Sequence, residues 1–215
     1  MGAVTNRLHA RVLGKNQPYE KILQQMQDFT RLRTEETPDE IWLLEHLPVF
    51  TLGRNGKREH LLNPGDIPVV PVDRGGQVTY HGPGQLIIYV LVDIRRKSIG
   101  IRELVIKLEQ AVIDFLAARG MQAQGDRGAP GVYVANQKIA ALGLRVSRGK
   151  TYHGLSFNVN PDLEPFQRIN PCGYAGLQVT SCRDLGIAES TMEVAGSVSE
   201  YLAQHLAYEQ VCWEM

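Results

Sequence analysis

The chain has 215 residues, with 23 lysines and arginines, 23 aspartates and glutamates, and 43% hydrophobic residues. Such a chain can bury a core unaided, and its 3 cysteines, with no CxxC pair, predict no disulfide framework. The net charge of zero argues against a nucleic-acid binder held by overall charge. The longest apolar run, Leu86–Val92, is too short to span a membrane, and the polar N-terminal segment lacks the apolar region of a secretory signal. We therefore expect a cytoplasmic protein with a single domain over residues 1–215.

Apolar residues recur at helical spacing in three segments, at 22–29, 101–116 and 194–205. Each stripe is flanked by polar residues, which is typical of a helix that buries one face. Ser190 and Glu193 have the spacing of a capping box, and this predicts that the third helix begins beside them.

Strands are predicted at 41–47, 85–93, 132–135, 138–146 and 153–159. The continuous apolar run in the second of these favours a central strand that is covered on both faces. The last three are expected to form an antiparallel meander, with turns at Asn136–Gln137 and Ser147–Lys150. The fold class that follows is α+β, with a mixed, largely antiparallel sheet packed with helices.

Several common catalytic motifs do not occur in the sequence. It contains no GxxxxGK[ST], GxGxxG, GxSxG or HExxH pattern, so nucleotide-binding, serine hydrolase and zinc protease functions lack a motif. Four histidines lack the spacing to Asp, Glu or Cys that a metal site needs: His9, His46, His60 and His205. We expect no metal.

The segment 73–84 is rich in glycine, and these residues allow its backbone to approach a ligand closely. Within it, Arg74 can bind an anion or a carbonyl-rich group, and His81 can carry a proton or donate a hydrogen bond. The alternative is a pair of turns around one strand at 77–80. The segment is therefore a candidate binding loop.

The three cysteines differ in their surroundings. Cys172 lies between Pro171 and Gly173, which predicts a thiol on a turn and makes it a candidate nucleophile. The alternative is a buried thiol that acts as a small hydrophobic side chain. Cys182 stands near an expected helix start that can lower its pKa, but no partner residue is evident beside it. Cys212, near the C-terminus, is interpreted as an incidental thiol.

Lys138 and His153 are polar residues on predicted strands. Period-two alternation puts Lys138 on one face with Ala140, Leu142 and other apolar residues. If that face is buried, the lysine is a candidate general base or a cation that stabilises a thiolate. The alternative is a lysine at the strand end that reaches water. His153 is interpreted as a structural histidine.

Four segments together closely resemble the octanoyltransferases of lipoic acid synthesis. These are Asp73–Gln85 (DRGGQVTYHGPGQ), Gly128–Arg145 (GAPGVYVANQKIAALGLR), Tyr152–Asn160 (YHGLSFNVN) and Arg168–Gly176 (RINPCGYAG). The resemblance extends from about Pro18 to Gly176 and is much more specific than any short motif. It implies a fold similar to the catalytic domain of the lipoate and biotin protein ligases.

The resemblance also implies roles for individual residues. Cys172 corresponds to the acyl-thioester nucleophile, and Lys138 to the residue that tunes this thiol and acts as acid and base. The implied substrate cleft is lined by Arg74, Gly75, Gly76, Gln77, Val78, Thr79, Tyr80, His81, Ala141, Leu142, Gly143, Gly154, Leu155 and Ser156. No cofactor is implied.

The implied partners are proteins. Octanoyl-acyl carrier protein would be the donor, and the acceptors would be lipoyl domains of 2-oxoacid dehydrogenase complexes and the glycine cleavage H protein. No nucleic acid and no membrane are implied. Acyl carrier proteins are typically acidic, and basic runs at 95–97 and 145–150 are candidates for steering one, with a solvated basic turn as the alternative.

Three alternative functions are also compatible with the sequence. An ATP-dependent lipoate–protein ligase would need no cysteine nucleophile. A non-enzymatic acyl-binding module would keep the fold without the chemistry. A cysteine hydrolase would use water in place of the amine and release free octanoate.

Overall fold

The computed structural model describes residues 6–126 and 128–214, and of Cys172 only the backbone. Within these residues, eight strands form a main sheet with the order β11-β1-β2-β6-β10-β9-β8-β7. They are β1 (Arg7–Gln17), β2 (Asp39–His46), β6 (Gln85–Leu91), β7 (Gln124–Gly125), β8 (Gly131–Val134), β9 (Gln137–Ser147), β10 (Lys150–Asn158) and β11 (Gln210–Glu214). β1 is parallel to β2 and β11, and the other neighbouring pairs are antiparallel. The predicted α+β class, with a mixed and largely antiparallel sheet, is confirmed.

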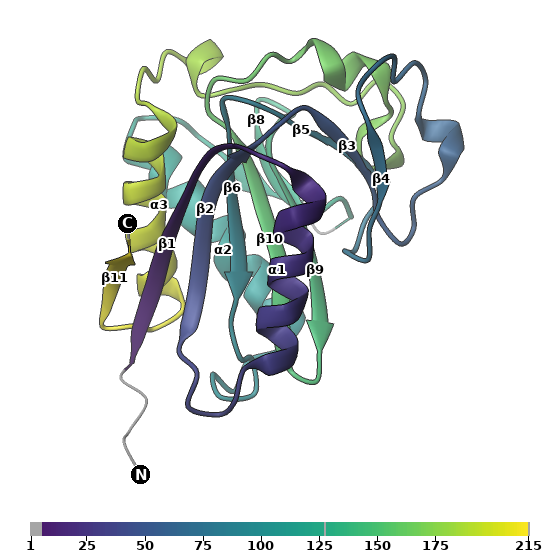
Figure 1. The fold of residues 1–215 in the computed structure, drawn as a ribbon. Coiled ribbons are helices and arrows are strands. Elements are labelled where there is room, and N and C mark those ends of the chain that lie inside the picture. Colours follow the sequence, from purple (N-terminus) through teal and green to yellow (C-terminus); the bar gives the residue numbers. More distant parts are fainter. Residues whose placement is uncertain (1–5, 127, 215) are drawn as a thin grey trace.

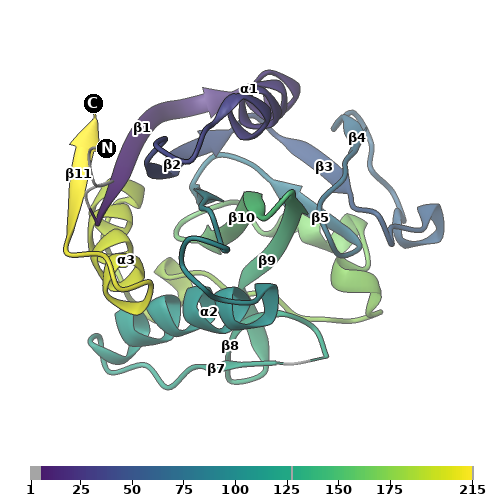
Figure 2. The ribbon, with the colours of Figure 1, turned by 90° about the horizontal axis from the view of Figure 1, so that it is seen from below.

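The helices cover the two faces of this sheet (Figures 1 and 2). They are α1 (Tyr19–Leu32), α2 (Ile101–Ala117) and α3 (Thr191–His205). α1 packs on the face to which Ile87 of β6 points, whereas α2 and α3 pack on the face to which Ile88 points. Because successive side chains of a strand point to opposite faces, a strand between two cores is apolar throughout, which explains the run in β6.

A second, three-stranded sheet lies beside one end of the main sheet, at the upper right in Figure 1. Its order is β4-β3-β5, with β3 (Val49–Leu52), β4 (Val69–Pro71) and β5 (Val78–His81). The described part of the chain also has four short 3-10 helices: η1 (Arg58–His60), η2 (Glu164–Arg168), η3 (Pro171–Gly173) and η4 (Arg183–Leu185). Phe50, Tyr80 and Phe166 form the centre of a separate small core here, and η3 lies beside β5.

The predicted helices and the capping box are all found. The backbone N–H of Glu193 donates to the Ser190 hydroxyl at 3.3 Å, and the Ser190 N–H donates to the Glu193 carboxylate at 2.8 Å. Both groups would otherwise lack a partner at the start of α3. Within the described residues, no helix is long and apolar enough to cross a membrane.

The meander is also found, but two of its details differ from the prediction. The turn between β8 and β9 is Ala135–Asn136, with φ of 47° and 64°, because Gln137 already pairs with Val134. The pairing of β8 with β9 also shifts between Val132 and Tyr133, so that β9 contains one extra residue beside Lys138. Strict alternation therefore fails between Lys138 and Ala140, and the predicted common face for these residues is wrong.

Candidate active site

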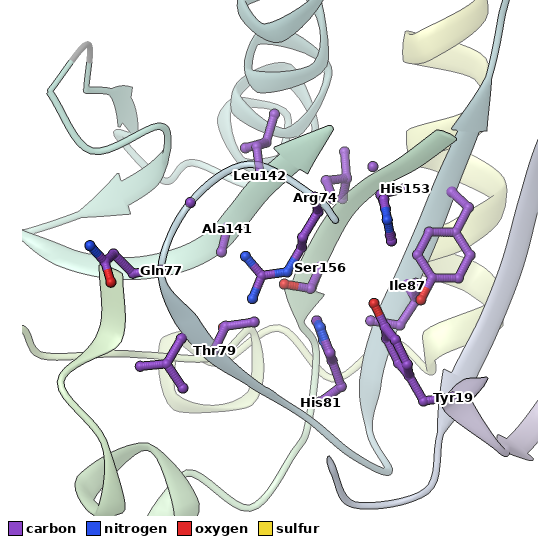
Figure 3. Close-up of a pocket in the computed structure, with 16 residues that line it drawn as sticks. Tyr19, Arg74, Gln77, Thr79, His81, Ile87, Ala141, Leu142, His153 and Ser156 are labelled. Carbon is purple, nitrogen blue, oxygen red and sulfur yellow. The ribbon is translucent and has the colours of Figure 1, made fainter. Parts of the chain in front are cut away.

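β5, β6, β9, β10 and the loop that follows Asp73 enclose a pocket (Figure 3). It is lined by Tyr19, Arg74, Gly76, Gln77, Val78, Thr79, His81, Ile87, Tyr89, Ala141, Leu142, Gly143, His153, Gly154, Leu155 and Ser156. The structure thus brings most of the predicted cleft residues together around one cavity. The cavity encloses about 50 Å³, which is room for a few water molecules.

Two of the predicted cleft residues do not line this cavity. The backbone N–H of Gly75 donates to the Leu144 carbonyl at 3.0 Å, so Gly75 joins the loop to β9. Tyr80 is buried in the small core, where its ring packs against Phe50 and Phe166. Gly75 and Tyr80 therefore support the glycine-rich segment and do not line the cavity.

Four residues line the cavity without having been predicted to do so: Tyr19, Ile87, Tyr89 and His153. Tyr19 is the first residue of α1, and the packing of that helix brings it over the cavity. Nothing in the local sequence near Tyr19 signals this, because the contact depends on tertiary packing. Its ring stacks on His81, with 5.9 Å between the ring centroids.

The tyrosines and histidines around Tyr19 are uncharged at neutral pH. Burial raises the pKa of Tyr19 to about 12 and raises that of Tyr89 well above its ordinary value. Burial also lowers the pKa of His46, next to the pocket, to about 4, and lowers that of His81 well below its ordinary value. The rings therefore present polar but neutral edges and apolar faces to the cavity.

His153 is held by a carboxylate and has an unusual backbone conformation. Its Nε2 lies 2.9 Å from Oδ1 of Asp73, and the Tyr152 hydroxyl donates to the other carboxylate oxygen. The hydrogen bond with His153 is the main cause that lowers the pKa of Asp73 to about 2. His153 has a φ of 59°, a left-handed conformation that is strained for a residue with a Cβ. Its buried Nδ1 has no hydrogen-bond partner in the described part of the chain.

Arg74 fixes the glycine-rich loop to the small sheet. One terminal nitrogen, Nη2, donates to the Thr51 carbonyl at 2.8 Å, and the other, Nη1, donates to the Gly75 carbonyl at 2.9 Å. Only 8% of the residue is exposed. These bonds give Arg74 a structural function, and its binding of a ligand stays a prediction.

Lys138 is buried at the start of β9, with 3% of its surface exposed, so the alternative of a lysine that reaches water is wrong. Its Nζ donates to the carbonyls of Pro130 at 3.2 Å and Ala129 at 3.5 Å, and lies 5.0 Å from the centroid of the Tyr133 ring. The lysine lines a second, smaller cavity. Thr79, Ala141 and Ser156 line both cavities, so Lys138 lies next to the larger pocket.

The backbone of η3 places the turn that carries Cys172 beside Lys138. Pro171 lines the same small cavity as Lys138. The segment that follows the turn pairs with the start of β9, because the Lys138 N–H donates to the Gln178 carbonyl at 2.9 Å and the Thr180 N–H donates to the Lys138 carbonyl at 3.0 Å. Gly173 has a φ of 80°, as the predicted sharp turn requires. The Cys172 side chain itself lies outside the described part of the structure.

The other features that the sequence singled out lie elsewhere. Cys182 is fully buried, and burial raises its pKa to about 12, so the lowered pKa considered for this thiol is wrong. Lys138 lies near the start of β9, and the basic run at 145–150 begins near the other end of the strand, about 23–30 Å away along it. Asp93 pairs with Lys150, which places the run at 95–97 at that same end. Within the described residues, no cluster of three or more His, Cys, Asp or Glu residues is suited to a metal ion.

Gly131 packs so closely against β9 that a side chain at this position has no room. A Cβ there would lie 2.5 Å from the Ala140 carbonyl oxygen and 2.9 Å from Cε of Lys138, and its φ of 154° is strained for other residues. Gly131→Ala is therefore expected to lower the free energy of unfolding by about 1–3 kcal/mol. Because Lys138 would be displaced, the acid and base function predicted for it should be impaired, with about a hundredfold lower activity per folded molecule. Urea unfolding and initial rates per folded molecule at neutral pH measure the two effects.

Gly196→Ala is the matched control, because no atom beyond its chain neighbours and the backbone of its own helix lies within 4 Å of the position of its Cβ. Gly196 is inside α3, where alanine should raise the free energy of unfolding by about 0.5–1 kcal/mol. Unchanged activity in Gly131→Ala would mean that Lys138 tolerates displacement.

Comparison with known proteins identifies relatives along most of the chain. Residues 11–207 match the family model described as the lipoyl protein ligase A/B catalytic domain. An octanoyltransferase of Thiobacillus denitrificans is 61% identical over 184 residues, which cover 86% of this chain and 84% of that protein. An octanoyltransferase of Shewanella amazonensis is 54% identical over 204 residues, which cover 95% of this chain and 94% of that protein.

Solved structures with low sequence identity have the same fold. A lipoate-protein ligase A bound with ATP gives a TM-score of 0.79 at 15% identity, over 97% of this chain and 87% of that one. The biotin protein ligase of Aquifex aeolicus gives a TM-score of 0.56 at 12% identity, over 94% of this chain and 70% of that one. The predicted likeness to the lipoate and biotin protein ligase fold is confirmed. From the family match and the sequence relatives together, we conclude that the chain belongs to the lipoyl protein ligase A/B catalytic-domain family and, within it, to the octanoyltransferases.

Proposed function

We propose that this octanoyltransferase moves the octanoyl group from acyl carrier protein to a lysine ε-amine of a lipoyl domain, through a thioester on Cys172. The observation that carries the proposal is the buried Lys138, which shares a cavity wall with the neighbour of Cys172 and adjoins a narrow pocket. The acceptors are lipoyl domains of 2-oxoacid dehydrogenase complexes and the glycine cleavage H protein.

The larger pocket is the site for the octanoyl chain in this proposal. Its walls combine small residues such as Gly143 with apolar side chains such as Leu142 and Leu155, and its buried tyrosines and histidines are neutral. Burial of the chain at ~0.8 kcal/mol per CH₂ supplies about 5–6 kcal/mol before losses. The cavity of about 50 Å³ must widen for eight carbons, and we expect the partly buried side chains of Gln77 and Leu142 to move.

In the first step, the Cys172 thiolate attacks the carbonyl carbon of the octanoyl thioester. The bond from that carbon to the phosphopantetheine sulfur breaks, and the new bond to the Cys172 sulfur remains. Lys138, as an ammonium, stabilises the thiolate before attack and gives a proton to the leaving sulfur. The step ends with an octanoyl thioester on Cys172 and a neutral Lys138.

In the second step, the acceptor lysine amine attacks the same carbon. Lys138 now accepts the proton that the amine loses, and the bond to the Cys172 sulfur breaks. The products are the octanoyl amide and the thiolate–ammonium pair with which the cycle began. Since a thioester is converted to an amide, the transfer is downhill and no ATP is consumed.

The proposal is tested with purified enzyme, octanoyl-acyl carrier protein and a lipoyl domain, in the absence of ATP and Mg²⁺. We expect octanoyl amide on the target lysine, and none on a lipoyl domain whose target lysine is replaced by arginine. Release of free octanoate without amide would instead indicate a hydrolase. A requirement for free octanoate and ATP would indicate a ligase, and either result would overturn the proposal.

A further inference from the structure

Glu109 is a buried carboxylate that the proposed chemistry does not use. It lies on α2, where Leu108 and Val112 pack in the main core, and only 9% of its surface is exposed. A carboxylate in such a place costs stability unless other groups compensate its charge. Its Oε1 accepts a hydrogen bond of 2.8 Å from the backbone N–H of Gly131.

The same peptide group connects Glu109 to Lys138. The Pro130–Gly131 peptide bond is trans, so its carbonyl and its N–H point in opposite directions. The Pro130 carbonyl accepts from Nζ of Lys138 at 3.2 Å, while the Gly131 N–H donates to Glu109. The ammonium of Lys138 therefore faces the negative end of the peptide dipole, and the carboxylate of Glu109 faces its positive end. Both orientations are electrostatically favourable.

Two glycines allow this close packing. A Cβ at Gly131 would lie 2.9 Å from Cε of Lys138, and a Cβ at Gly125 would lie 2.9 Å from the second carboxylate oxygen of Glu109. The backbone at Gly131 thus lies close to the Lys138 side chain, and the backbone at Gly125 lies close to the Glu109 carboxylate. Hydrogen bonds in series polarise one another, so a hydrogen bond at one end of a peptide strengthens the hydrogen bond at its other end.

We propose that Glu109 is a positioning residue for Lys138: through the Pro130–Gly131 peptide it holds the ammonium in place and keeps it protonated. The proposal rests on the function proposed above, in which the ammonium form of Lys138 is needed for acyl loading. An opposite charge nearby favours the charged form of a lysine, and removing it makes the lysine lose its proton at lower pH.

Other titratable groups also face this site. They are Tyr133, whose ring centroid lies 5.0 Å from Nζ of Lys138 and whose hydroxyl donates to the Ala129 carbonyl, and Asp126, which is close enough to Glu109 to raise its pKa. Burial is the largest cause that raises the pKa of Glu109, and the Gly131 N–H and Lys138 lower it. Glu109 is the residue in this group that can be made neutral without losing the hydrogen bond to Gly131.

The test measures the single-turnover rate of acyl loading from octanoyl-pantetheine between pH 6 and 10, by intact-protein mass spectrometry. Glu109→Gln keeps an oxygen for the Gly131 N–H but removes the charge. We expect the high-pH limb of the profile, where Lys138 deprotonates, to move down by about one pH unit. Glu109→Asp, which keeps the charge, should lie between the parent and the glutamine variant, and it decides the question if Glu109→Gln does not fold.

Two controls separate this inference from the proposed function. Glu103→Gln removes one exposed carboxylate from the same helix and should leave the profile unchanged. Lys138→Met should lack the high-pH limb in its residual loading, which assigns that limb to Lys138. If Lys138→Met loses the limb but Glu109→Gln superimposes on the parent, Glu109 is only structural and the proposed function stands. If Lys138→Met keeps the limb and the rate of the parent, the proposed function of Lys138 fails, and this inference fails with it.

Discussion

Cys172→Ser is expected to lower octanoyl transfer by at least about a thousandfold. A serine hydroxyl does not ionise near neutral pH, so the ammonium of Lys138 has no thiolate to stabilise and the covalent route is closed. The remaining rate would come from direct attack by the acceptor amine on bound donor. Initial rates with octanoyl-acyl carrier protein and a lipoyl domain measure the loss.

Cys182→Ser is the matched control for this prediction. The Cys182 thiol is fully buried and its pKa is raised to about 12 by burial, so it is not a thiolate at neutral pH. A buried hydroxyl in its place should lower the free energy of unfolding by about 1–3 kcal/mol, with little change in the rate per folded molecule. Equal losses of activity in the two variants would mean that Cys172 is not the nucleophile.

Acidification from pH 7 to pH 5.5 is expected to lower the free energy of unfolding by at least about 1 kcal/mol. In the unfolded chain His46, His81 and His153 bind protons near pH 6.5, but in the folded protein burial lowers the pKa of each, to about 4 for His46. The unfolded state therefore binds more protons below pH 7, and stability falls with falling pH. His46, with a folded pKa of about 4, contributes about 1.2 kcal/mol over this interval, and His81 and His153 change stability in the same direction.

Urea unfolding at pH 7.5, 6.5 and 5.5 measures this dependence. His46→Gln provides the comparison, because it removes one of the three titrations as well as the hydrogen bonds of His46 to Gln17 and Tyr89. The variant should be less stable at pH 7.5 but should lose less stability on acidification than the parent. A parent stability that is flat or that rises between pH 7.5 and 5.5 would contradict the burial of neutral histidines.

The sequence predicts those helices and strands whose pattern of apolar residues is complete within one segment of the chain. The apolar run of β6 and the helical stripes are of this kind, because each depends on which faces of one element are buried. β1 was missed because its sequence, RLHARVLGKNQ, is half polar and basic, and only Leu8 and Ala10 are fully buried. β4 and β11 have three and five residues and were missed because most of their stabilisation comes from neighbouring strands.

The same distinction applies to the candidate site, where some residues lie in recognisable sequence motifs and others do not. The loop that starts at Arg74 and the turn that carries Cys172 have strong sequence motifs, and the structure places both next to Lys138 or its pocket. Tyr19 and Glu109 come from helices whose own patterns indicate only packing. Their places beside the pocket and beside Gly131 depend on how α1 and α2 dock on the sheet, which periodicity within one segment does not encode.

The covalent intermediate is tested most directly by intact-protein mass spectrometry of the enzyme mixed with octanoyl-acyl carrier protein, without ATP and without an acceptor. We expect one octanoyl adduct that maps to Cys172 and that disappears, with formation of octanoyl amide, when a lipoyl domain is added. Absence of the adduct, together with an acceptor that is modified only when free octanoate and ATP are supplied, would contradict transfer through Cys172.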